Sequence, residues 1–188
     1  MPMIKILMLL TLAAGLAFGP QTAYAQSDKS AVTKDNSNFA IPKPMEVEHN
    51  ELHAALAQLM KAGGRTGEAA QAVAELLDHH FTKENDYALP PLSLLVPLSQ
   101  GKFECRMTGV LPLTDKLEAD MPTMLAEHKD ITQALIKLRD VATSEDKPAG
   151  VQFAEHLTAH AQTEEQITYP TALLVGLYVK SRAAQCAR

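Results

Sequence analysis

Apolar residues recur at spacings of three and four along several stretches of the chain, which is the pattern of helices with one buried face. The first stretch places Leu52, Leu56 and Leu59 on one face and ends at Gly63 and Gly64, which suit a helix C-terminus. Further stretches begin near residues 66, 114 and 148. No segment shows the alternation typical of a strand. The pattern therefore predicts four amphipathic helices.

Prolines and a long connection set the limits of these helices. The second helix is expected to stop around Pro90, and the third carries Pro122 in its first turns. The fourth runs from Pro148 to Pro170, and residues 171–179 are expected to continue it after a kink. Residues 92–113 form a longer connection with one short helical turn. Four helices with one long connection predict an all-α, antiparallel four-helix bundle over residues 45–180.

The N-terminus has the three parts of a secretory signal peptide. Lys5 precedes an apolar run at residues 6–18, and the small-residue pattern Ala23-Tyr24-Ala25 follows. The run is shorter than the roughly 20 residues of a transmembrane helix. We expect residues 1–25 to be removed, leaving a periplasmic or secreted chain without membrane insertion; an uncleaved anchor is the alternative. A polar tether at 26–44 and a C-terminal tail at 181–188 flank the predicted bundle.

Composition and charge exclude several classes of partner and chemistry. The formal net charge of −5 comes with no cluster of Lys and Arg, so nucleic acid is not an expected partner. Cys105 and Cys186 match no metal or redox motif; in an oxidising compartment they either form a disulfide or remain two unrelated thiols. No GxSxG motif or phosphate-binding glycine loop is present.

Histidines are the strongest chemical signal, because all seven fall within the predicted helices. In each helix one His is in phase with the apolar stripe, and in the second and fourth helices a Glu follows four residues later. These inward-facing residues are His49, His80, Glu84, His128, His160 and Glu164. Burying ionised carboxylates without partners costs several kcal/mol each, at least on the order of the whole stability of a domain. One or two cations would satisfy them, since imidazole and carboxylate both bind iron, manganese and zinc.

The same residues form an internal repeat. Glu48-His49 reappears as Glu127-His128, 79 residues later. The set His80, Glu84 and Pro90 reappears 80 residues later as His160, Glu164 and Pro170. Two such halves are expected to pack with pseudo-two-fold symmetry and to present equivalent ligands to one centre.

The doubled HxxxE with its trailing proline resembles the hemerythrin-like, or HHE cation-binding, family over about residues 47–174. The resemblance implies a four-helix bundle around two iron ions, joined by an oxo or hydroxo bridge, and it carries the ligand role to the six residues above. The oxygen-carrying members are less similar. They have a second His where this chain has Thr132, and an Asp where it has Glu164.

His53 lies one turn after His49 and could supply the histidine that Thr132 does not. The hypothesis is a five-histidine site with its halves exchanged: three histidines on one iron (His49, His53, His80) and two on the other (His128, His160). A core or outer position for His53 is the alternative. His156, in phase with His160, is expected to hydrogen-bond to His53 or to a ligand, and His79 to lie at the flank of its helix.

These observations lead to two expected functions. The first is an exported di-iron protein that binds, senses or scavenges a small oxidant such as O2, peroxide or NO, with any electron donor unknown. The second is a helical interaction module, held together by zinc or manganese or free of metal, without redox chemistry. The sequence does not decide whether there is turnover.

Overall fold

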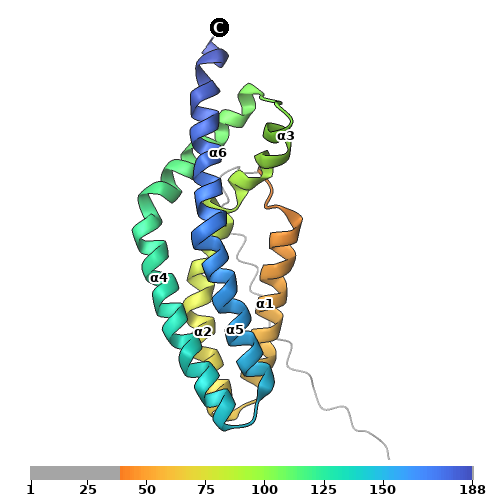
Figure 1. Cartoon of the computed structure of the whole chain (residues 1–188), viewed down its shortest axis with the longest axis vertical. Coiled ribbons are helices and arrows are strands. Elements are labelled where there is room, and N and C mark those ends of the chain that lie inside the picture. Colours follow the sequence, from red (N-terminus) through yellow and green to blue (C-terminus); the bar gives the residue numbers. More distant parts are fainter. Residues whose placement is uncertain (1–38, 188) are drawn as a thin grey trace, which may run out of the picture. The chain divides into compact units, whose positions relative to one another are not determined.

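The computed structural model describes residues 39–187, which are helical and contain no strand. Four long helices form a bundle: α1 (Lys43–Lys61), α2 (Gly64–Lys83), α4 (Leu111–Ser144) and α5 (Pro148–Thr163) (Figure 1). Both α1 and α4 pack against α2 and α5. The prediction of an all-helical bundle is confirmed. The predicted signal peptide at residues 1–25 lies outside the described residues.

The long connection before α4 is more helical than predicted. It contains 3-10 turns at Pro90–Leu94 and Cys105–Val110 and the short helix α3 (Leu95–Ser99). Helix α4 begins at Leu111 rather than near Thr114, so Pro122 lies in its interior and not in its first turns. Proline there removes one backbone hydrogen bond, and Figure 1 shows α4 bending in its first half.

Helices α2 and α5 each end in a wider π-helical turn, at Glu84–Ala88 and Glu164–Thr168. The amide of Leu89 donates to the carbonyl of Glu84 at 2.9 Å, and α6 (Tyr169–Arg182) continues directly after the second turn. The wider turn shifts the buried face by about one residue. Ile167, which a regular helix would place in phase with His160 and Glu164, is therefore 62% exposed, whereas Tyr169 is fully buried.

The core consists of two apolar clusters with polar residues between them. One cluster includes Tyr87, Met124 and Tyr169, and the other includes Leu52 and Leu157. Along the chain, His128 lies between Met124 of the first cluster and Ile131 of the second, and Glu84 lies between Phe81 of the second cluster and Tyr87 of the first. The polar residues are therefore enclosed by apolar side chains along the bundle.

Close helix contacts and one carboxylate hold the end of the bundle where α2 begins. A Cβ at Gly150 would lie 2.7 Å from the Cβ of Ala142, so this glycine allows α5 to approach α4 closely. The carboxylate of Glu145 accepts hydrogen bonds from the amides of Arg65 and Thr66, at 3.1 and 3.0 Å. These bonds satisfy free N–H groups at the start of α2 and lower the pKa of Glu145 to about 2, with the Thr66 hydroxyl as the largest contributor.

The two cysteines, for which the sequence left both states open, form a disulfide between Cys105 and Cys186 with a Cα–Cα distance of 5.5 Å. The bond joins the connection before α4 to the 3-10 turn Ala183–Ala187 that follows α6. The predicted C-terminal tail is thus largely helical. Of the helices in residues 39–187, none has both the length and the apolarity needed to cross a bilayer.

We expect removal of this disulfide to destabilise the fold. The bond closes a loop of 81 residues, and the chain-entropy model gives up to about 4 kcal/mol of stabilisation for such a loop. The double variant Cys105→Ser/Cys186→Ser should unfold at lower urea concentration than the parent, as measured by circular dichroism. A reductant should destabilise the parent and leave the variant unchanged. Equal midpoints for the two proteins would contradict this role.

Candidate metal centre

Six buried side chains from the four long helices and their adjoining turns converge in the middle of the bundle. They are at most 7% exposed. The set comprises His49, His80, Glu84, His128, His160 and Glu164. These are the six inward-facing residues that the sequence analysis identified.

The donor atoms fall into two groups that could each hold a metal ion. His80, Glu84, His128 and Glu164 form one group, in which one donor atom from each residue lies within 4.8 Å of the others. His49, His160 and Glu164 form the second group by the same measure. We call these groups the His80/His128 group and the His49/His160 group. Glu164 belongs to both.

Each carboxylate directs one oxygen toward each group. Oε1 of Glu164 lies 3.0 Å from His160 Nε2, and its Oε2 lies 3.4 Å from His128 Nε2. Oε1 of Glu84 lies 3.5 Å from His80 Nε2, and its Oε2 lies 3.6 Å from His49 Nε2. A carboxylate placed in this way can bridge two neighbouring cations.

Three outer carboxylates fix the orientation of three imidazole rings. In each case a glutamate oxygen lies about 3 Å from a histidine Nδ1: Glu127 with His80 (2.9 Å), Glu165 with His128 (3.0 Å) and Glu48 with His160 (3.1 Å). An ionised carboxylate can only accept a hydrogen bond, so Nδ1 of His80 and Nδ1 of His128 carry the proton and donate it. Glu48 faces Nδ1 of His160 as an ion-pair partner. Nε2 is then the nitrogen of each ring that points into the cluster, where it can bind a metal once it has lost any proton it carries.

When no cation is bound, several donor atoms that face the inside of the cluster lack hydrogen-bond partners. Nε2 of His80 and Nε2 of His128 lie 2.7 Å apart, so one of the two nitrogens must carry a proton to join them when no cation lies there. Nε2 of His49 and of His160, together with Glu84 Oε2 and Glu164 Oε1, have no hydrogen-bond partner among the described residues. Buried polar atoms left in this way cost about 1–3 kcal/mol each. Cations at the two groups would satisfy them, so the donor set fits a metal pair.

The ionisation of the cluster is strongly coupled. Burial, followed by the charge of Glu164, raises the pKa of Glu84. Burial opposes the charged form of His160, but the adjacent Glu164 carboxylate, 3.0 Å from Nε2, outweighs it and raises the pKa of His160 to about 9. Protons therefore partly compensate the buried carboxylates when no cation does, and a metal would have to displace them.

Tyr169 is part of the site, and the sequence analysis did not identify it. Its hydroxyl lies 2.5 Å from Glu84 Oε1 and within 3.3 Å of Nε2 of His80 and of His128. Burial, then the charge of Glu84, raises its pKa, so the phenol keeps its proton and donates to Glu84. The sequence did contain a signal for this residue. Tyr169 immediately precedes Pro170, whereas the equivalent position of the first repeat, before Pro90, is Leu89, so the repeat places a polar group at a position that is otherwise apolar.

His53 does not join the cluster. It is exposed, and its ring meets the edge of Phe81 with centroids 5.0 Å apart. Phe81 also stacks on His49, with ring centroids 4.1 Å apart, so its ring contacts both histidines. The structure groups His49 with His160 and His80 with His128, and His53 belongs to neither group, so the geometry gives no support to three histidines on one ion and two on the other.

The remaining histidines lie outside the two groups. His79 is exposed on α2, as expected. His156 is exposed, and its Nε2 lies 3.8 Å from Glu48 Oε1. Glu48 and Glu127 were recognised only as part of the repeat; their contacts with His160 and His80 give them an orienting role.

Comparison of the chain with protein-family models, with curated proteins and with solved structures found no match. The interpretation of the site therefore rests on its own geometry and donor chemistry.

Paired histidine variants test which imidazoles bind metal. We expect His49→Ala and His80→Ala to lower metal affinity at least about tenfold, because each removes an inward Nε2. His53→Ala and His79→Ala are matched controls on the same helices and should bind as the parent does. Titration calorimetry with Fe2+, Mn2+ and Zn2+ under anaerobic conditions measures the difference. Equal losses in both members of a pair would contradict the assignment.

Tyr169→Phe tests the phenol without removing its ring. In the metal-free protein, the free energy of unfolding should fall by about 1–3 kcal/mol, because Glu84 Oε1 loses its buried donor. Tyr178→Phe, at a partly exposed tyrosine of α6, should have little effect. Urea unfolding in the presence of a chelator compares them, and a Tyr169 variant as stable as the parent would remove the phenol from this account.

Proposed function

We propose that this chain is a hemerythrin-like di-iron protein that binds a small oxidant such as O2, peroxide or nitric oxide. One observation carries the proposal: Glu84 and Glu164 each direct one oxygen toward the His80/His128 group and the other oxygen toward the His49/His160 group. Two carboxylates arranged in this way, with two imidazoles on each side, match the ligand needs of two neighbouring cations.

The number and type of donors favour iron or manganese over zinc. The His80/His128 group offers two imidazole nitrogens and two carboxylate oxygens, with the Tyr169 hydroxyl close by. Structural zinc sites are closed by four ligands, often including cysteine, and both cysteines of this chain are in the disulfide. Nitrogen and oxygen donors with room for further ligands suit iron, which supplies redox chemistry and open coordination positions when bound.

The surrounding residues would prepare the site for this role. Glu48, Glu127 and Glu165 hold the Nδ1 protons and so keep Nε2 free for ligation. The two apolar clusters limit the access of water, which strengthens electrostatic interactions within the site. Tyr169 holds a proton next to Glu84, where it can donate a hydrogen bond to an oxygen atom.

The proposal includes the finer fold, an antiparallel bundle with a pseudo-two-fold repeat. Equivalent contacts support it: Glu48 meets His160 in one half, and Glu127 meets His80 in the other. Both π-helical turns also begin at equivalent glutamates, Glu84 and Glu164.

The proposal also places the mature protein in the periplasm or outside the cell. The signal-like sequence at residues 1–25 is its main support. The disulfide between Cys105 and Cys186 agrees with an oxidising compartment.

Metal analysis of the protein purified from its native compartment, with no metal added, tests the function. We expect two iron ions per chain and a visible absorption band that changes when azide binds to the oxidised protein. Glu164→Gln should lose the iron, because this carboxylate serves both groups, and the exposed Glu155→Gln should keep it. Zinc or manganese in place of iron, or a metal-free protein whose melting temperature does not respond to a chelator, would favour the interaction module instead.

A further inference from the structure

The His49/His160 group lies beside a cavity of about 320 Å³. Two of its ligands, His160 and Glu164, form part of the cavity wall, together with Met45, Glu48, Thr163 and Thr168. His156 and Thr163 are exposed, so the cavity opens to solvent between α1 and α5. A small molecule in it would lie next to ligands of this group.

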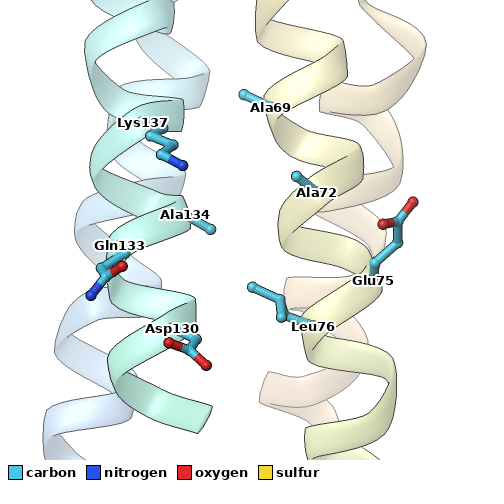
Figure 2. A pocket seen from close by; sticks show the side chains of 8 residues that line it. All are labelled: Ala69, Ala72, Glu75, Leu76, Asp130, Gln133, Ala134 and Lys137. Carbon is cyan, nitrogen blue, oxygen red and sulfur yellow. The ribbon is translucent and has the colours of Figure 1, made fainter. Parts of the chain in front are cut away.

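Another hollow does not reach the site. A groove of about 380 Å³ lies between α2 and α4, where Ala69, Ala72 and Ala134 leave space (Figure 2). Its lining includes none of the six inward-facing residues of the cluster. It therefore offers no route to either histidine group.

The equivalent positions near the His80/His128 group carry other side chains, which are paired or buried. Lys83 stands where the second repeat has Thr163, and its Nζ lies 2.5 Å from Glu127 Oε1 and 3.7 Å from Asp120 Oδ2. Met124, the counterpart of Met45, is fully buried. The Tyr169 hydroxyl lies among the donor atoms of this group. The two groups thus share a ligand pattern but differ in access.

We propose that a ligand of two or three atoms enters through the cavity lined by Thr163 and binds at the ion held by His49 and His160. This inference rests on the proposed di-iron function and specifies which ion accepts the ligand. The size of the residue at position 163 sets the width of the passage. At the equivalent position near the His80/His128 group, the larger Lys83 occupies the corresponding space. His80, Glu84, His128 and Glu164 would hold the other ion, and the hydroxyl of Tyr169 lies among these donors.

Filling the passage tests the proposal without touching a ligand of the ions. Thr163→Leu adds bulk, and Thr163→Lys places the residue of the first repeat opposite Glu48. Gln162→Leu and Gln162→Lys are controls at the preceding exposed position, which does not line the cavity. Stopped-flow absorbance would follow azide binding to the oxidised protein and nitric oxide binding to the reduced protein. Because nitric oxide is uncharged, its binding rate in Thr163→Lys reports the added bulk of the side chain and not the charge of the lysine.

Both Thr163 variants should keep the parent's iron content, while association and dissociation rates of each ligand fall together by about tenfold or more. The dissociation constants should change little, because a narrower passage slows entry and exit alike. Unchanged rates in Thr163→Leu, or equal slowing in Gln162→Leu, would overturn the proposed passage. Such a result in a protein that holds two irons would leave the di-iron function standing, whereas an iron-free parent would remove the function itself.

Discussion

The buried charge of Glu84 and Glu164 is the constraint on which the rest of the structure depends. Both carboxylates lie between two apolar clusters, and their free oxygens face imidazole nitrogens that also lack partners. An arrangement of this kind is costly for an empty bundle and favourable for one that holds cations. The outer glutamates are consistent with the second case, because they hold three imidazoles in the orientation that ligation needs.

The sequence predicted the parts of the structure that depend on helical periodicity. The positions of His80, Glu84, His160 and Glu164 relative to Leu77 and Leu157 were enough to identify them as buried. Periodicity failed where the helix is not regular. The π-helical turn after Thr163 exposes Ile167 and buries Tyr169, so the phenol escaped notice. The same reasoning from helical spacing made His53 a candidate ligand. Spacing does not reveal side-chain packing, such as the stacking of Phe81 against His49.

The differences between the repeats explain why the two halves of the centre are unequal. At equivalent positions, the first repeat has Leu89, Lys83 and Asn85 where the second repeat has Tyr169, Thr163 and Glu165. The last difference matches the surroundings of two histidines. Glu165 contacts Nδ1 of His128, whereas Nδ1 of His49 has no hydrogen-bond partner in residues 39–187. A shared framework thus supplies two ligand sets, and a few substitutions give one set a phenol and the other an opening to solvent.

Anomalous diffraction at the iron absorption edge, from crystals of the protein grown without added metal, tests the central claim most directly. The account predicts two iron peaks, one at the His80/His128 group and one at the His49/His160 group. A cluster without metal, or a single ion held by only one of the two histidine pairs, would contradict it.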